Sequence, residues 1–415
     1  MARWVERAGS TGRYCGFSLW IFRACSRISR SRICRLAFLI SVVAFGATIL
    51  FFLGGFHATE TRQEHVYSQE LRLATGRPTQ PRVNTASSHR NTSRTSRPFV
   101  EKYRLNYSNN ATEFFRRLKG IIEQGRAWKP SAKKKREFSV ELRRELGDAG
   151  NIGVFSLTKN NAQVGTTMRF SIVGANRNIS QTLWNYLPED ANFKSGQFQS
   201  CSVVGSSGIL RGSGCGKEID RSQYVVRFNV APVEGFEADV GSKTNFTTLN
   251  PSYVKYRLNG LKTQADRSQF GAILKQFIGS KLWLPAFGVS GYFRVMQLTA
   301  AAAFDSKMVQ PLIGHPEHHH SVTNLWRKMA MRKRALPSTG MYFILSLFDV
   351  CDQINVFGFW PYETAINGSE VPYHYHNAAI GKKTIHDFDT EFQTLVNLYE
   401  QDIIKMHLGS CLEFS

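Results

Sequence analysis

The sequence predicts an α/β domain whose mainly parallel sheet is covered by helices on both faces. From about residue 150 onward, short runs of β-branched and aromatic residues alternate with longer segments of helical character. The short runs are typical of buried strands. Alternation of strands and helices favours a parallel sheet. Ligands of such sheets bind at the carboxyl ends of the strands, where the loops gather.

Five runs carry the predicted strands. The first run breaks on glycine, and the next two are stopped by proline, as strand ends commonly are. The runs span residues 201–205, 224–232, 244–252, 281–287 and 353–360.

Two longer segments predict helices against this sheet. Ser338 is a suitable N-cap for the apolar run that continues to residue 351. Beyond Asp389, apolar residues recur at helical spacing. These residues are Phe392, Leu395, Val396, Tyr399, Ile403 and Met406.

The loop after the first predicted strand is rich in glycine. Its sequence, Gly205-Ser206-Ser207-Gly208, can bring backbone amides close to a nucleotide. The loop matches neither the G-x-G-x-x-G fingerprint nor a P-loop, because no Gly-Lys-Ser/Thr follows. By itself it is only a weak indication of a nucleotide site.

Residues 36–56 are predicted to cross a membrane once. These 21 residues carry no charge, and about 20 apolar residues span a hydrocarbon core of roughly 30 Å. Eight arginines and a single acid precede them, so the positive-inside rule predicts a cytosolic tail at residues 1–35 and translocation of the rest. A cleaved signal peptide is the alternative, although its apolar region would normally be about 7–15 residues long. The pattern favours a type II signal anchor.

The formal net charge of +22 is concentrated ahead of the predicted domain. Residues 1–150 contain 28 lysines and arginines against 11 acids, whereas residues 151–415 contain 25 against 20. This distribution argues against nucleic-acid binding. Residues 57 to about 110 are too polar to bury a core, and residues 116–144 predict one or two basic amphipathic helices. We therefore predict a lumenal stem at residues 57–150, whose basic part is either a solvated helix face or a surface for an anionic polymer.

Cysteines and sequons beyond the anchor fit an oxidising compartment. An even number of lumenal cysteines predicts two disulfides; these cysteines are Cys201, Cys215, Cys351 and Cys411. Buried free thiols are the alternative, and the wide spacing disfavours a structural zinc site. Six N-x-S/T sequons predict a glycoprotein. They lie at Asn91, Asn106, Asn110, Asn178, Asn245 and Asn367.

Four segments resemble the motifs of a known family and occur in the same order along the chain. Residues 201–250 closely resemble the large sialylmotif of the animal sialyltransferases (glycosyltransferase family 29), and residues 337–361 resemble the small sialylmotif. The sequence YHYH at 373–376 is similar to the short third motif. His386 and Glu391 match the H-x-x-x-x-E pattern of the very small motif. The sequences GCGKEID and DVGSKTN most resemble those of the α-2,8 branch, which adds sialic acid to sialic acid.

The resemblance covers roughly residues 150–415 and implies one catalytic domain at residues 151–415. It implies a Rossmann-like fold, a variant of GT-A, in a single-pass type II enzyme of the Golgi membrane. The implied reaction transfers sialic acid from CMP-sialic acid to a sialylated glycoprotein or glycolipid, with inversion at the anomeric carbon. The oligomeric state stays open, with a homodimer among the alternatives. The pairing known in the α-2,8 branch implies the bridges Cys201–Cys351 and Cys215–Cys411, which the chain-entropy model values at about 4–5 kcal/mol each.

The resemblance also implies roles for single residues. His386 is the expected general base, because the acceptor hydroxyl must lose a proton and imidazole titrates near neutral pH. His374 is expected to stabilise the departing phosphate, with Tyr373 beside it. Glu391 is expected to support the segment of His386. The remaining donor contacts, which include the amides of a helix N-terminus, are expected from Ser206, Asn229, Ser338, Thr339, Gly340 and Trp360.

A departure from the family pattern at residue 206 keeps a second function open. Ser206 stands where the family usually has asparagine. A serine lacks the separate donor and acceptor of an amide, and one lost hydrogen bond costs about 1–3 kcal/mol. A weak or inactive membrane-anchored relative that only binds sialylated glycans is therefore one alternative.

A metal-dependent glycosyltransferase is the other alternative. Asp387 and Asp389 form a pair of the kind that holds Mn²⁺ on a nucleotide diphosphate, but helix capping explains them better. CMP-sialic acid carries a single phosphate, so we expect no metal or other cofactor. The triplet His318–His320 is a poor metal site as well, because consecutive residues seldom converge on one ion.

Overall fold

The computed structural model describes residues 99–103, 111–124, 128–190, 193–333, 335–377 and 386–411. The predicted tail, membrane segment and first part of the stem lie outside these ranges, as do the sequons at Asn91, Asn106 and Asn110. Within the described ranges, no helix combines the length and the apolar character needed to span a bilayer.

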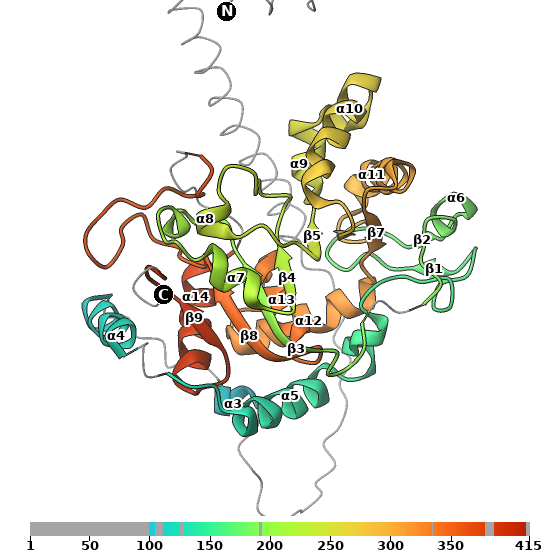
Figure 1. Cartoon of the computed structure of the whole chain (residues 1–415). Coiled ribbons are helices and arrows are strands. Elements are labelled where there is room, and N and C mark those ends of the chain that lie inside the picture. Colours follow the sequence, from blue (N-terminus) through green and yellow to red (C-terminus); the bar gives the residue numbers. More distant parts are fainter. Residues whose placement is uncertain are drawn as a thin grey trace, which may run out of the picture. The chain divides into compact units, whose positions relative to one another are not determined.

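A seven-stranded sheet lies at the centre of the fold (Figure 1). The strand order is β7-β6-β5-β4-β3-β8-β9, and every neighbouring pair is parallel. The strands are β3 (Phe198–Val204), β4 (Tyr224–Arg227), β5 (Phe246–Thr248), β6 (Lys281–Leu284), β7 (Gln310–Ile313), β8 (Cys351–Phe357) and β9 (Lys405–His407). The predicted parallel sheet and its five predicted strands are therefore confirmed. A separate two-stranded sheet pairs β1 (Thr167–Met168) with β2 (Arg177–Asn178).

The order of the strands reverses between β3 and β8. The chain runs outward from β3 through β4, β5, β6 and β7, and then returns to the other side of β3 with β8 and β9. Parallel sheets bind ligands at such a reversal, beside the carboxyl ends of the strands. The loops that leave β3 and β8 touch closely there, because Gly205 N donates to Phe357 O at 2.8 Å. A Cβ on Gly205 would lie 2.4 Å from Gly358 O, so this close approach requires glycine.

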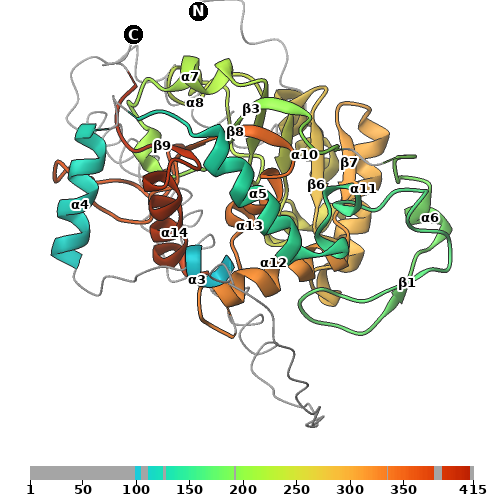
Figure 2. The same ribbon diagram turned by 90° about the horizontal axis from the view of Figure 1, so that it is seen from below.

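Alternate strand residues face two different helical layers. Val203 and Trp283 belong to the core beneath one layer, whereas Val204 and Leu282 face the opposite side. The first layer contains α5 (Ala132–Leu146), α12 (Pro316–Met329), α13 (Thr339–Leu347) and α14 (Phe388–Glu400), which Figure 2 shows together. The second contains α7 (Gly216–Arg221), α8 (Glu237–Val240), α9 (Pro251–Arg257), α10 (Gln264–Leu274) and α11 (Phe293–Ser306). The peripheral α6 spans Gln181–Trp184.

The predicted helix after Asp389 ends earlier than its apolar pattern indicated. Helix α14 stops at Glu400, and Met406 lies in strand β9 instead. The interruption has a local cause, because Asp402 adopts a left-handed conformation with φ of 60°. The chain then turns back to pair with β8, which the side-chain periodicity alone did not reveal.

Part of the predicted stem belongs to the folded domain. Helices α3 (Phe99–Tyr103), α4 (Ala111–Gln124) and α5 bury apolar residues in the same core as the sheet. Phe138 is fully buried, with its ring 4.5 Å from that of Phe348. Trp128 stacks on Tyr399 at 5.4 Å. Helices of the predicted stem therefore pack on the same core as the sheet, through apolar residues that recur at helical spacing within a strongly basic segment.

Several basic residues of segment 116–144 are paired with acids of the domain. Lys134 Nζ lies 2.7 Å from Asp402 Oδ2, and Arg143 pairs with Asp349. Arg117 pairs with Glu400 on α14. These three contacts use basic side chains to dock the helices, so part of the segment's charge is structural.

The three described sequons differ in exposure. Asn178 and Asn367 are exposed. Asn245 is half-buried beside β5, and its Oδ1 accepts a hydrogen bond from Val225 N at 2.8 Å.

We therefore expect glycans at Asn178 and Asn367 but none at Asn245. Asn→Gln variants, compared by gel shift with and without a glycosidase, will test this; a shift that disappears in Asn245→Gln alone would contradict it.

Candidate active site

The loops that follow β3 and β8 are joined by backbone hydrogen bonds. Tyr375 N donates to Ser206 O at 2.9 Å, and Gly208 N donates to Pro372 O at 3.0 Å. The Tyr375 hydroxyl donates to Pro232 O at 2.6 Å, which ties the same loop to the segment after β4. The third motif at 373–376 therefore lies directly on the glycine-rich loop. The half-buried Ser206 hydroxyl makes no hydrogen bond to a described residue.

Asn229 links the carboxyl ends of β4 and β5. Its φ of 54° is left-handed, a conformation that asparagine tolerates. Its backbone N donates to Thr248 Oγ1, and its Oδ1 accepts from Asn250 N, both at 3.0 Å. Asn250 Oδ1 in turn accepts from Thr339 Oγ1 at 3.4 Å. The sequence analysis did not single out Asn250. Its position directly after a predicted strand and before Pro251, which begins a helix, could have indicated a site residue.

The N-terminus of α13 is held by a buried carboxyl group. Ser338 N and Ser338 Oγ donate to the two oxygens of Glu391 at 2.6 and 2.5 Å. Ser338 Oγ also accepts from Met341 N, so Ser338 is the N-cap that the sequence predicted. Glu391 therefore supports Ser338, whereas the expectation was that it supports the segment of His386. A Cβ on Gly340 would lie 2.5 Å from Phe359, so this helix start packs tightly.

Glu391 makes stability depend on pH. Burial raises the pKa of Glu391 from 4.5 to about 8, against the opposing effect of its bonds with Ser338. Between these values the folded protein keeps a proton that the unfolded chain has released, so this group's contribution to the free energy of unfolding falls as pH rises from 4.5 to 8. We expect Glu391→Gln to flatten that fall, measured by urea unfolding at about pH 5 and about pH 8. Glu363→Gln, at an exposed site, is the control; equal slopes in all three proteins would contradict the assignment.

His386 lines a pocket at the start of α13. The pocket is also bordered by Thr339, Asn250 and Leu336. His386 Nδ1 lies 3.1 Å from Leu336 O. A carbonyl can only accept, so Nδ1 carries the proton and Nε2 is the basic nitrogen. Burial lowers the pKa of His386 below 6.5, although this hydrogen bond opposes the effect.

His374 occupies the second part of the site, in the loop joined to Ser206. Its Nδ1 lies 3.2 Å from Asn377 Nδ2. An amide nitrogen donates, so Nδ1 accepts and the proton of the ring is on Nε2. Burial lowers the pKa of His374 to about 3, assisted by the charges of His376 and Arg257. His374 is thus a neutral hydrogen-bond donor at neutral pH rather than a cation.

Two aromatic residues expected at the donor differ in their surroundings. Tyr373 is half-buried, with its ring 4.4 Å from that of His374. Trp360 is buried, and its Nε1 donates to Thr364 O at 3.2 Å. Its ring packs edge-on against Phe392. Trp360 therefore packs in the core, and its expected place against the cytidine stays a prediction.

The residues that suggested a metal have structural partners. Asp387 is the N-cap of α14, accepting from Thr390 N at 3.1 Å. Asp389 Oδ1 accepts from the Tyr362 hydroxyl at 2.6 Å. His318 is buried with Nδ1 2.8 Å from the Tyr342 hydroxyl. In the described part of the chain, no cluster of three or more His, Cys, Asp or Glu side chains could hold a metal ion.

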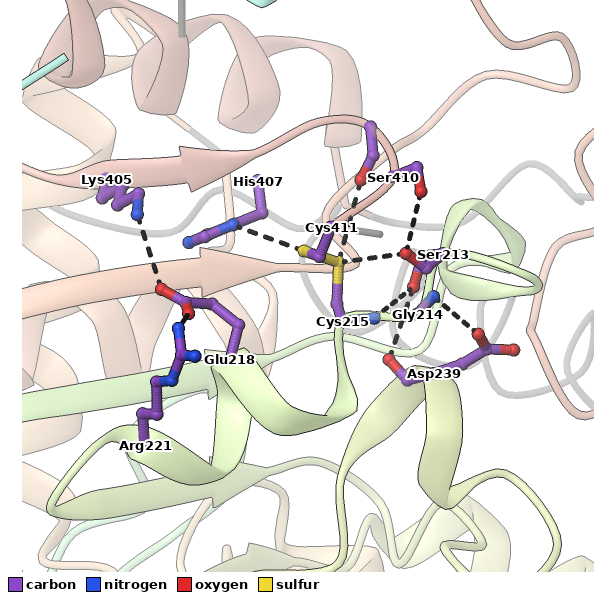
Figure 3. The surroundings of a disulfide bond; sticks show 11 residues. Ser213, Gly214, Cys215, Glu218, Arg221, Asp239, Lys405, His407, Ser410 and Cys411 are labelled. Carbon is purple, nitrogen blue, oxygen red and sulfur yellow. Dashed lines mark hydrogen bonds and ion pairs between the residues drawn. A yellow bond between two sulfur atoms is a disulfide. The ribbon is translucent and has the colours of Figure 1, made fainter. Parts of the chain in front are cut away.

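Both implied disulfides are present. Cys201–Cys351 joins β3 to β8, and Cys215–Cys411 joins the loop after β3 to the C-terminal segment. Figure 3 shows the second bridge, around which Cys411 N donates to Ser213 O at 2.8 Å. Asp239 accepts from Gly214 N at 2.9 Å. The segment that follows the glycine-rich loop, at residues 213–215, is therefore held both by the C-terminal segment and by Asp239.

The fold and these motifs define a glycosyltransferase of the sialyltransferase class. Residues 156–403 match Glycosyltransferase family 29 (sialyltransferase). The chain belongs to this family, as the sialylmotifs predicted.

Two relatives and two solved structures are similar to this chain. Alpha-2,8-sialyltransferase 8E of Rattus norvegicus is 30% identical over 261 residues, which cover 61% of this chain and 68% of the relative. The same protein of Mus musculus is also 30% identical, and the chain spans 62% of it, less than two thirds. A mammalian sialyltransferase in complex with Gal-β-1-3GalNAc-ortho-nitrophenol is 24% identical with a TM-score of 0.37, covering 51% of this chain and 70% of that one. A second mammalian sialyltransferase structure is 21% identical with a TM-score of 0.42, covering 64% and 93%.

Proposed function

We propose that this protein transfers sialic acid from CMP-sialic acid to the terminal sialic acid of a glycoprotein or glycolipid, forming an α-2,8 linkage with inversion. The proposal is based mainly on the surroundings of His386. Its ring lines a pocket, and the contact of Nδ1 with Leu336 O makes Nε2 the basic nitrogen. The name of the similar rat and mouse proteins, alpha-2,8-sialyltransferase 8E, supports the linkage.

In this proposal His386 activates the acceptor. A sugar hydroxyl is a poor nucleophile at neutral pH, so Nε2 takes its proton as the oxygen attacks the anomeric carbon of the donor. The bond from that carbon to the phosphate of CMP breaks as the new bond forms, which inverts the anomeric carbon. The lowered pKa of His386 keeps the ring unprotonated and ready to accept a proton.

The donor phosphate would lie between α13 and His374. Thr339 N and Gly340 N are the first free amides of the helix, since neither donates to a described residue, and a helix N-terminus attracts anions. His374 would donate from Nε2 to the departing phosphate. Asn229, Tyr373 and Ser206 would line the nucleotide and sugar. Ser338 acts indirectly in this arrangement, because its hydroxyl is engaged with Glu391.

We further propose that the domain acts in the Golgi lumen, held by a single-pass type II anchor at residues 36–56. The two disulfides support an oxidising compartment. The uncharged 21-residue segment preceded by eight arginines supports the anchor and its orientation.

The test is transfer of labelled sialic acid by the full chain, with acceptors that end in α-2,3- or α-2,6-linked sialic acid and the same acceptors without it. Transfer confined to the sialylated acceptors, in a product cleaved only by an α-2,8-specific sialidase, would support the proposal. Transfer to the unsialylated acceptors alone would overturn the linkage while retaining the family's chemistry.

Two further arms separate the alternatives. We expect transfer to persist in excess EDTA, and its loss would favour the metal-dependent alternative. If the folded protein transfers to nothing, Ser206→Asn restores the family's amide beside the donor. Activity gained by that variant would identify Ser206 as the cause, whereas continued inactivity with retained glycan binding would favour the binding protein.

A further inference from the structure

The loop that contains His374 is anchored through the next residue, Tyr375. The Tyr375 side chain is buried, and its ring lies 5.2 Å from that of Phe236. Its backbone N donates to Ser206 O at 2.9 Å, and its hydroxyl donates to Pro232 O at 2.6 Å. Because His374 directly precedes this anchor, any movement of the Tyr375 backbone also moves the imidazole.

Arg211 binds the carbonyl group of the same residue. Its Nε lies 3.1 Å and its Nη2 lies 2.9 Å from Tyr375 O. A guanidinium presents its N–H groups in a rigid planar fork, so a contact through two of them fixes direction as well as distance. Hydrogen bonds from a charged donor are also stronger than those from a neutral one. Arg211 therefore adds a directional contact to the one residue that anchors the loop.

The backbone around Arg211 is itself held in place. Gly212 N donates to Asp239 Oδ2 at 2.7 Å, and Gly214 N donates to Asp239 Oδ1 at 2.9 Å (Figure 3). The next residues, at 213–215, are joined to the C-terminal segment by a disulfide and a backbone hydrogen bond. The guanidinium of Arg211 thus extends from a fixed segment to the loop that contains His374.

The orientation of His374 is important for its proposed role. Its Nδ1 accepts from Asn377 Nδ2 at 3.2 Å, which leaves the Nε2 proton for a ligand. A hydrogen bond weakens steeply when its angle falls below about 120°. A misplacement of about 1 Å in an active site can cost about 10²-fold in rate. A neutral imidazole that stabilises a leaving phosphate through one hydrogen bond therefore needs a rigid support.

We propose that Arg211 is a positioning residue for the departure of CMP: by holding Tyr375 O, it keeps Nε2 of His374 directed at the phosphate. The inference rests on the proposed function, since it takes His374 as the donor to that phosphate. It goes beyond the proposed function by assigning the alignment of His374 to an arginine whose hydrogen bonds go to the protein backbone.

The experiment measures binding of CMP to the full chain in detergent by titration, so the readout does not need turnover. Arg211→Met removes both hydrogen bonds and is expected to weaken CMP binding about five- to tenfold. In parallel, kcat for sialyl transfer is expected to fall about 10- to 100-fold. Arg211 is exposed, so far-UV circular dichroism should stay unchanged.

Two further variants test the geometry of the contact. Arg211→Lys keeps the charge but lacks the planar fork, so its loss of CMP binding is expected to be smaller, about two- to threefold. Arg221→Met is the matched control, because Arg221 is also exposed and pairs with Glu218 on its own helix, α7. An equal loss in Arg221→Met and Arg211→Met would contradict the specific role of Arg211.

A double-mutant cycle with His374→Ala separates positioning from a purely structural role. In the His374→Ala background, Arg211→Met is expected to change CMP binding by less than about twofold, since the group that it positions is gone. An undiminished loss in that background, or no loss in the wild-type background, would overturn the proposal. A protein that shows this coupling in CMP binding but transfers no sialic acid would uphold the role of Arg211 and overturn the proposed function.

Discussion

His386→Ala is expected to lower kcat for sialyl transfer by about 10²–10⁴-fold, the range typical for loss of a general base. The reason is local, because His386 Nδ1 is engaged with Leu336 O and leaves Nε2 as the basic atom of the pocket. The fold should persist, since the side chain is only half-buried. The measurement is kcat and KM with saturating CMP-sialic acid, alongside far-UV circular dichroism.

The pH profile gives an independent readout of the same residue. A base must be unprotonated to act, so kcat/KM falls as pH decreases through its pKa. Burial lowers the pKa of His386, so the acid limb should lie below pH 6.5. That limb should be absent from the residual activity of His386→Ala. His320→Ala, also on a half-buried histidine, is the control; the same loss in both variants would contradict the assignment.

Removing the bridge Cys201–Cys351 is expected to lower the free energy of unfolding by about 4–5 kcal/mol. The bridge closes a loop of 150 residues between β3 and β8, and both cysteines are fully buried. Whole domains are stable by only about 5–15 kcal/mol. The double variant Cys201→Ala/Cys351→Ala should therefore fold poorly, as measured by denaturant unfolding and by the yield of secreted or membrane-inserted protein.

The second bridge offers a matched comparison. Cys215–Cys411 lies at the edge of the sheet, and Cys411 is half-buried. By the same chain-entropy argument its removal should lower the free energy of unfolding by a similar amount, and it should also weaken donor binding, because the bridge fixes the segment around Ser213. Equal loss of unfolding free energy and equal donor affinity in the two double variants would show that both bridges act only through chain entropy.

The sequence predicted the central strands well because they are buried on both faces. Their apolar runs stand out against the polar loops, as in residues 201–205 and 281–287. The edge strands β7 and β9 escaped prediction. Strand β7 contains Pro311, which only an edge strand accommodates easily, and β9 has only three residues, of which Lys405 and His407 are polar. Short edges carry too few apolar residues to give a pattern.

The packing of α5 on the domain was also hidden from the sequence, for a related reason. Net charge describes a whole segment, whereas burial depends on one helix face. In α5, Phe138, Leu142 and Leu146 are buried, whereas Lys134 and Arg143 pair with acids of the domain and Lys135 donates to Phe348 O. Only packing against Phe348 and its neighbours reveals that this helix belongs to the domain.

The sequence by itself determined the fold class, the family and the disulfide pairing. Only the tertiary structure decided which contacts the predicted site residues make. It showed that Glu391 holds Ser338, that Trp360 is a core residue, and that Nδ1 of His386 bonds to Leu336 O. The physical reason is that a motif specifies side chains, whereas protonation and hydrogen bonding depend on neighbours such as Leu336 that lie 50 residues away in the chain.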